Sequence, residues 1–161
     1  MEESMNGKVN TESMSFHKTV EDVFALPKQD IRNATPLTLA FVGDNVYDLV
    51  VRTALYENGN RNLDSMHKKK SSIVKASAQA WVADYLLNNG LFTEEEAEYY
   101  RKGKNAKSLS HAKNSNLSDY HKATGLECVM GYLYLTEREH RAVELCKLGI
   151  DAYMVVSGNS K

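Results

Sequence analysis

Apolar residues recur at helical spacing through most of the chain, and no segment alternates apolar and polar residues in the manner of paired strands. The most apolar run lies between residues 39 and 52. It follows Thr35-Pro36, a favourable N-cap with a proline at the first helical position. The pattern predicts a core-facing helix from Pro36 to about Glu57. Its expected buried stripe is Leu39, Val42, Val46, Leu49, Val50 and Thr53.

The same periodicity predicts about six helices in all, and hence an all-α fold class. The other helices are expected at 16–26, 62–89 with a break near Lys70, 93–102, from Leu117 or Ser118 through Leu133, and 137–156. Val143, Cys146, Ile150 and Tyr153 form the expected stripe of the last helix. Gly103 to Ser118 is predicted to be a loop. The length fits a single domain at 16–156, with tails at 1–15 and 157–161 that we expect to be disordered.

Polar residues inside two of the apolar helices are the first candidates for chemistry. A glycine inside a helix destabilises it by about 1 kcal/mol relative to alanine, so the presence of Gly43 requires an explanation, such as close packing against another helix. Asp44 and Asp48 lie one turn apart and repel each other unless a positive charge is near. Glu127 lies in a second apolar helix, one turn before Gly131. Each acid alone is compatible with a solvated or ion-paired residue, whereas carboxylates on two packed helices can hold Mg²⁺.

Composition narrows the class of protein. The net charge is −1, and the chain has two cysteines and five histidines. Two thiols give no disulfide framework and favour a cytoplasmic location. No apolar segment is long enough to cross a membrane, and the polar N-terminus predicts no secretory signal. The phosphate-binding loop, the GxSxG and HExxH motifs and paired CxxC ligands are all absent from the sequence.

Two basic segments are candidates for binding nucleic acid. Residues 67–75 and 101–118 are rich in lysine, and residues 101–118 contain five Lys or Arg, one His and no acid. Because few aromatic residues are interleaved with these charges, duplex RNA fits better than stacked single strands. A solvated surface loop remains the alternative. The candidate RNA-binding residues are Lys68, Lys69, Arg101, Lys102, Lys104, Asn105, Lys107, His111, Lys113 and Asn114.

Four segments then resemble one known family. Phe41-Val-Gly-Asp-Asn-Val-Tyr-Asp-Leu-Val-Val51 resembles the signature helix of ribonuclease III. Thr124-Gly-Leu-Glu-Cys-Val-Met-Gly-Tyr-Leu-Tyr-Leu135 resembles the family's second acidic helix, and the segment from Leu63 to Ala76 lies between them as in the family. Arg101-Lys-Gly-Lys-Asn-Ala-Lys107 is similar to a loop of the Mini-III subgroup, a catalytic domain without a double-stranded-RNA-binding domain.

The resemblance implies a homodimeric, Mg²⁺-dependent endoribonuclease that cleaves double-stranded RNA, with Mn²⁺ as a substitute ion. Asp44 and Glu127 would be its catalytic metal ligands, and Asp48 an outer-sphere partner of Asp44. Hydrolysis would leave 5′-phosphate and 3′-hydroxyl ends with a short 3′ overhang. The subgroup's role implies maturation of large-subunit (23S) ribosomal RNA from its precursor. In the dimer the signature helices would meet at the two-fold axis, which also offers an explanation for Gly43.

The chain departs from the family at two acidic positions. Ala40 stands where ribonuclease III has a Glu, four residues before Asp44, and Thr124 stands where it has an Asp, three residues before Glu127. Two acids support one well-held Mg²⁺ more readily than two. These losses also keep open a non-catalytic duplex-RNA-binding homodimer, and a helical interaction protein with structural acids is a further alternative.

Overall fold

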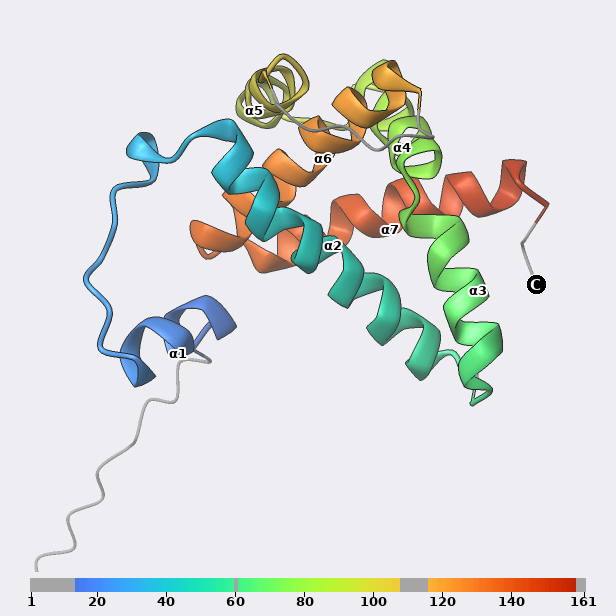
Figure 1. The fold of residues 1–161 in the computed structure, drawn as a ribbon, viewed down its shortest axis with the longest axis horizontal. Helices are drawn as coiled ribbons and strands as arrows, with labels where there is room; N and C mark the ends of the chain where they lie inside the picture. Colours follow the sequence, from blue (N-terminus) through green and yellow to red (C-terminus); the bar gives the residue numbers. More distant parts are fainter. Residues whose placement is uncertain (1–13, 60, 108–115, 159–161) are drawn as a thin grey trace, which may run out of the picture.

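The computed structural model describes residues 14–59, 61–107 and 116–158, and no strand occurs within these ranges. Its elements are α1 (Phe16–Val23), a 3₁₀ turn (Ile31–Asn33), α2 (Pro36–Glu57), α3 (Leu63–Val74), α4 (Ala76–Asn88), α5 (Glu94–Lys104), α6 (Leu117–Leu135) and α7 (Glu139–Val156) (Figure 1). The all-α prediction is confirmed. Most of the two predicted tails and the middle of the predicted loop lie outside the described residues.

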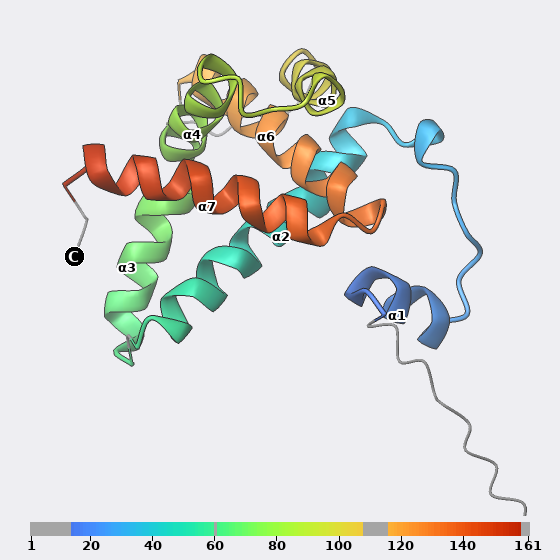
Figure 2. The ribbon, with the colours of Figure 1, turned by 180° about the vertical axis from the view of Figure 1, so that it is seen from behind.

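Helix α6 is the centre of the fold. It packs against α2, α4, α5 and α7, and α7 crosses the face of the molecule seen in Figure 2. Four apolar side chains of α6, at helical spacing, have no exposed surface: Leu126, Val129, Met130 and Leu133. Burying side chains of this kind stabilises a fold by roughly 1.5–3 kcal/mol each. The helix that carries Glu127 is therefore held on several sides.

Two glycines allow α2 and α6 to cross at very short range. A Cβ atom at Gly43 would overlap the carbonyl oxygen of Glu127, and a Cβ at Gly131 would overlap the carbonyl oxygen of Leu39. Close packing therefore explains Gly43, as the sequence suggested. The partner is α6 of the same chain, so the expectation that Gly43 serves a dimer axis was wrong.

The buried face of α2 also differs from the predicted stripe. The buried residues are Leu39, Ala40, Gly43, Tyr47 and Val51. Leu49 is 58% exposed, and Thr53 is exposed as well. The prediction failed because α2 is apolar on more than one side, so periodicity alone did not show which side meets α6. An apolar surface is left uncovered as a result.

Two other predictions of helix position need correction. The long helix predicted at 62–89 breaks at Lys75, which has an extended backbone (ψ 153°) between α3 and α4, rather than near Lys70. On α7, Val143 is 48% exposed, and the helix buries Ala142, Leu145, Cys146 and Gly149 instead. Apolar spacing alone fixes neither the position of the break between α3 and α4 nor the side of α7 that is buried.

Helix α5 is longer than expected at its basic end. It runs to Lys104, so Gly103 is helical and lies against α6, where an added Cβ would be 2.5 Å from the Cβ of Cys128. Burial raises the pKa of the Cys128 thiol to about 12, which makes it a packing residue rather than a reactive one. The first turn matches the prediction, since Thr93 and Glu96 form a capping box.

Helix α1 stands beside the body at the end of an extended linker (Figure 1). It has no buried residue, and Ser15 caps it while donating a hydrogen bond to Glu137 (3.1 Å). Among the described residues, no helix combines the length and the apolar character required to cross a membrane.

Candidate active site

A cleft of about 320 Å³ lies between α2, α4 and α6. Helix α2 contributes its first three turns, α4 its first turn and α6 its N-terminal half, and Val74 comes from the end of α3. The lining residues are Leu37, Ala40, Phe41, Asp44, Asn45, Val74, Ala76, Gln79, Tyr120, Ala123, Thr124 and Glu127.

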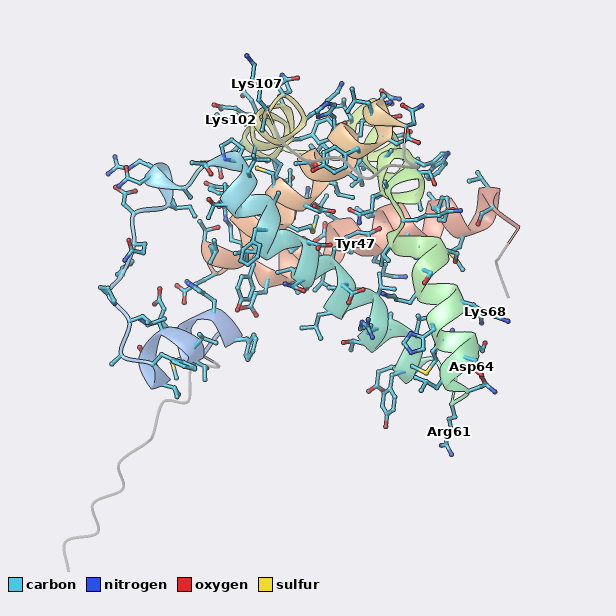
Figure 3. The ribbon with its side chains drawn as sticks, viewed as in Figure 1. Tyr47, Arg61, Asp64, Lys68, Lys102 and Lys107 are labelled. Carbon is cyan, nitrogen blue, oxygen red and sulfur yellow. The ribbon has the colours of Figure 1, made fainter. Side chains whose placement is uncertain are left out.

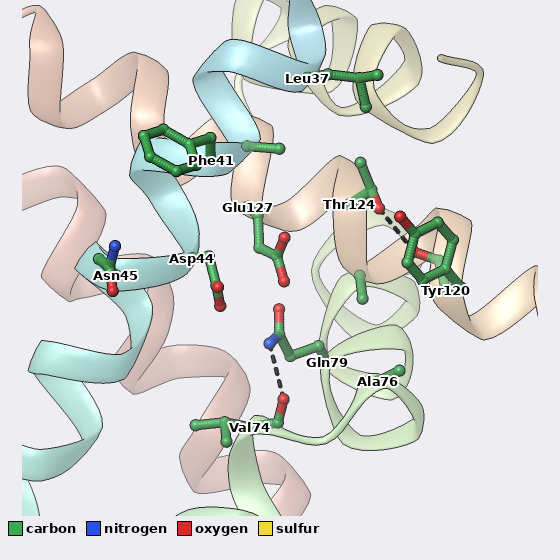
Figure 4. Close-up of a pocket in the computed structure, with 12 residues that line it drawn as sticks. Leu37, Phe41, Asp44, Asn45, Val74, Ala76, Gln79, Tyr120, Thr124 and Glu127 are labelled. Atoms are coloured by element: carbon green, nitrogen blue, oxygen red, sulfur yellow. Dashed lines mark hydrogen bonds between the residues drawn. The ribbon is translucent and has the colours of Figure 1, made fainter. Parts of the chain in front are cut away.

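Asp44 and Glu127 meet in this cleft from α2 and α6 (Figure 4). Their meeting follows from the glycine crossing, because Gly43 lies directly against the backbone of Glu127. The two acids, 83 positions apart in sequence, thus become neighbours through backbone packing. The structure brings together the two residues that the sequence singled out.

The environment of Glu127 disfavours its negative charge. Burial, reinforced by the nearby Asp44 carboxylate, raises the pKa of Glu127 to about 8, and the Gln79 amide opposes only part of this rise. Among the residues that the structure describes, no Lys or Arg lines the cleft. Two carboxylates in such a place call for a compensating positive charge, which a bound cation can supply.

The two positions where this chain lacks the family's acids line the same cleft. Ala40 and Thr124 are both buried beside the two carboxylates. The Thr124 hydroxyl is already engaged, because it donates to the carbonyl oxygen of Tyr120 at 2.9 Å. These two positions therefore provide shape rather than negative charge.

Gln79 is a polar lining residue that the sequence interpretation missed. It lies in the first turn of α4, is only 3% exposed, and points toward Glu127 (Figure 4). A signal was present in the sequence, since Gln79 interrupts an apolar run from Ala78 to Ala83. Its meaning depended on the break at Lys75, which directs this turn of α4 into the cleft.

Asp48 does not join the site. It is absent from the lining of the cleft, and its carboxylate accepts from Arg52 Nε at 2.6 Å and lies 3.7 Å from Lys70 Nζ. These two ion pairs, rather than a metal ion, answer the repulsion expected between Asp44 and Asp48. The arrangement gives no support to an outer-sphere role for Asp48.

The candidate RNA-binding residues fall into two separate groups. Figure 3 shows Lys102 and Lys107 at one end of the molecule and Lys68, on α3, at the other. Lys69 is also on α3, and Arg101, Lys102 and Lys104 occupy the last turn of α5, with Asn105 as its C-cap. His111, Lys113 and Asn114 lie outside the described residues.

The basic residues at the end of α5 also stabilise the helix itself. Positive side chains in the last turn of a helix interact favourably with its dipole. Lys102 pairs with Glu98 at 3.1 Å and lies over the ring of Tyr99. Within the described residues, no carboxylate forms an ion pair with Lys104 or Lys107. Those two lysines are therefore the better candidates for phosphate contacts.

The donor set of the cleft fits a hard cation. Within the described ranges, no group of three or more His, Cys, Asp or Glu side chains is placed to hold a metal ion. Two carboxylates and an amide oxygen remain, and oxygen donors are what Mg²⁺ and Mn²⁺ prefer. Mg²⁺ usually takes only one or two carboxylates from a protein and keeps several waters.

Comparison with known proteins gives matches over most of the chain. Residues 37–138 match the Ribonuclease III domain family. A Mini-ribonuclease 3 of Clostridium tetani is 39% identical over 133 residues, which cover 82% of this chain and 87% of that protein. A Mini-ribonuclease 3 of Enterococcus faecalis is 38% identical over 117 residues, which cover 73% and 89%.

A solved structure matches the fold as well. A crystal structure of a Fusobacterium nucleatum protein has a TM-score of 0.66 and 27% sequence identity, and the match covers 77% of this chain and 98% of that one. The range matched by the domain family includes both carboxylates, Gln79 and the two glycines of the helix crossing.

Proposed function

We propose that this chain, which belongs to the ribonuclease III family and is an endoribonuclease, hydrolyses double-stranded RNA at the Asp44–Glu127 cleft with a bound Mg²⁺ ion. The observation that carries the proposal is the meeting of these two carboxylates in one cleft. Family membership as a nuclease sets aside the non-catalytic alternatives that Ala40 and Thr124 had kept open.

The chain's own residues have three tasks in this reaction. Asp44 and Glu127 hold the cation, and Mn²⁺ would fit the same oxygen donors. The tight crossing at Gly43 fixes the separation of the two carboxylates, which limits reorganisation during the reaction. When bound, the ion supplies positive charge to the phosphate and activates water as the nucleophile. The products would carry 5′-phosphate and 3′-hydroxyl ends.

The test is cleavage of a long RNA duplex in Mg²⁺ by the wild type, Asp44→Asn and Glu127→Gln, followed by analysis of the ends. We expect each variant to lose roughly 10²–10³-fold or more in rate, the scale on which removal of one positioned electrostatic partner acts. The variants should keep wild-type circular dichroism, because neither change adds volume.

Asp151→Asn is the matched control for this test. It makes the same chemical change on the exposed face of α7, where Asp151 pairs only with Lys147 among the described residues. It should cleave at the wild-type rate. Wild-type rates in both cleft variants would exclude these two residues as the catalytic pair.

We propose further that the end of α5 holds the phosphate backbone of the duplex, together with Lys68 and Lys69. Support comes from the exposed Lys107 beside Lys104 and from the group's position at the end of a helix that packs on α6. His111, Lys113 and Asn114 follow in the sequence and belong to the same proposal. The cationic groups on α3 and α5 lie on separate parts of the molecule, Lys102 and Lys107 at the top of the view and Lys68 at the lower right (Figure 3).

Neutralising Lys104 and Lys107 together to glutamine tests this binding surface. We expect weaker duplex binding and a slope of log affinity against log salt that is smaller by about one to two units. The slope falls because fewer counterions are released from the RNA when fewer phosphates are contacted. The control is Lys147→Gln, an exposed lysine on α7. An unaltered salt slope in the double variant would remove the end of α5 from the RNA interface.

Precursor ribosomal RNA, and within it the 23S portion, is the substrate that we propose from the family resemblance, in the cytoplasm. Incubation with precursor 23S RNA and mapping of the cut ends tests this assignment. Cleavage of generic duplexes without any defined cut in the precursor would contradict it.

A further inference from the structure

The amide oxygen of Gln79 is buried without a partner. The side chain is 3% exposed, and Oε1 accepts no hydrogen bond within the described part of the chain. An unsatisfied buried acceptor costs about 1–3 kcal/mol, so its retention requires an explanation. The oxygen lies in the lining of the catalytic cleft, which suggests where that explanation is to be found.

The break between α3 and α4 determines which end of the amide faces the cleft. The N–H groups of Ala78 and Gln79 both donate to the carbonyl of Lys75, so the carbonyl of Val74 is left at the end of α3. Gln79 Nε2 donates to that carbonyl at 2.9 Å. A flipped amide would place two acceptor oxygens together at Val74, so the amide oxygen must face the cleft.

The oxygen faces two acidic side chains rather than an N–H group. Figure 4 shows the side chains of Gln79, Asp44 and Glu127 converging on one space from α4, α2 and α6. Within residues 14–59, 61–107 and 116–158, no Lys or Arg lines this space. When Glu127 is ionised, three groups present acceptor oxygens to one another, and they repel unless a cation lies among them.

We propose that Gln79 is a positioning residue of the cation site, whose Oε1 contacts the divalent ion or a water molecule that the ion holds. The proposal rests on the proposed function of the cleft. It also accounts for the two missing acids, since the neutral amide provides an oxygen donor from α4 where Ala40 and Thr124 provide no charge. The ion would thus be held from three helices rather than two.

The test is Mn²⁺ binding to the metal-free protein by titration calorimetry, without RNA. Gln79→Leu removes both the oxygen and the Nε2 donor, whereas Gln79→Glu removes the donor and keeps an oxygen. We expect Leu to weaken Mn²⁺ binding by about tenfold or more, the usual effect of losing a supporting group at a metal site. We expect Glu to bind Mn²⁺ at least as tightly as the wild type.

Comparison of Gln79→Leu with Gln79→Glu distinguishes a role at the ion from a merely structural role. If Gln79 only anchors Val74, both variants lose that anchor and weaken Mn²⁺ binding alike, which overturns the proposal. Wild-type affinity in Gln79→Leu also overturns it. If the Leu variant does not fold, the Glu variant decides: retained affinity supports the proposal, and weakened affinity overturns it.

Two controls complete the experiment. Asp151→Asn removes a charge on the exposed face of α7, outside the lining of the cleft, and should change Mn²⁺ affinity by less than about twofold. Asp44→Asn tests the site itself. If Asp44→Asn binds Mn²⁺ as the wild type does, the proposed function fails; if it loses binding while Gln79→Leu keeps it, only the role of Gln79 fails.

Discussion

At the scale of single residues, the geometry of the candidate cleft depends on two glycines. Gly43 and Gly131 let α2 and α6 touch through their backbones, and this contact sets the distance between the two carboxylates. A helical glycine sacrifices about 1 kcal/mol relative to alanine. That loss is small beside the cost of separating two packed helices.

Gly43→Ala is accordingly expected to destabilise the protein despite its gain in helix propensity. The new methyl group would overlap the carbonyl oxygen of Glu127, which is backbone and cannot rotate away. Overpacking of this kind costs about 1–3 kcal/mol or more, against a gain of about 1 kcal/mol. Urea denaturation measures the difference, and duplex cleavage should fall with it because the carboxylates move apart.

Gly131→Ala should behave in the same way, because its Cβ would overlap the carbonyl oxygen of Leu39. Thr53→Ala, on the exposed side of α2, is the control and should remain within about 0.5 kcal/mol of the wild type. Unchanged stability in both glycine variants would show that the helices cross less closely than described.

At the scale of elements, α5 is anchored at the end opposite to its basic residues. Glu96 is buried, and Arg141 of α7 donates to both of its oxygens, at 2.7 and 3.0 Å. The same carboxylate accepts from the backbone of Thr93 at 2.9 Å. Although burial opposes ionisation, the hydrogen bonds from Arg141 and Thr93 lower the pKa of Glu96 below its ordinary value.

This lowered pKa predicts a dependence of stability on pH. The contribution of Glu96 is present above its unfolded pKa of about 4.5 and is lost as pH falls through the lower, folded pKa. Glu96→Gln should therefore be less stable than the wild type by about 2–4 kcal/mol at pH 7, with a smaller difference in strongly acidic solution. Urea midpoints at several pH values measure this.

Glu98→Gln provides the control on the same helix. Its carboxylate forms an exposed pair with Lys102, so its removal should cost less than about 0.5 kcal/mol at any pH. A stability difference for Glu96→Gln that stays constant from pH 7 into acid would contradict the ionic role of Glu96.

At the scale of the whole molecule, α2 presents an apolar surface that no other part of the described chain covers. Phe41 is 75% exposed and Leu49 is 58% exposed, and Val42 and Val46 are half-buried between them. Contiguous apolar surface of this kind marks an interaction site. We propose that a second copy covers it, giving the homodimer that the family resemblance implies.

Leu49→Lys tests the dimer. In a symmetric interface the substitution places two lysines against apolar surface, so we expect the dissociation constant to rise by at least about tenfold, or about 1.4 kcal/mol. Sedimentation equilibrium measures this. Because the cleft is built within one chain, Mn²⁺ binding should persist in the dissociated protein.

Val143→Lys is the matched control, since Val143 is exposed to a similar degree on α7. It should leave the association state unchanged. A wild-type dissociation constant for Leu49→Lys, or equal weakening by both substitutions, would remove this face of α2 from the interface.

The sequence by itself determined the helical class, most helix positions and the two carboxylates. These features are local: apolar spacing, caps such as Thr35 and Thr93, and acids within apolar helices can be recognised without any partner. The ambiguity in α2 was also local, because an apolar residue looks the same whether it faces the core or a second molecule. Leu49 and Val143 were assigned to the core for that reason.

Only the tertiary structure decided which residues share the cleft. The sequence paired Asp44 with Glu127 only through the family resemblance. The structure gives the physical cause, because Gly43 lets α6 approach while Arg52 and Lys70 engage Asp48. The orientation of Gln79 depends on the interruption of the helix at Lys75. This interruption leaves the Val74 carbonyl without a helical partner, and Gln79 donates to it. Such relations are set by packing between distant segments, which the order of residues along the chain does not express.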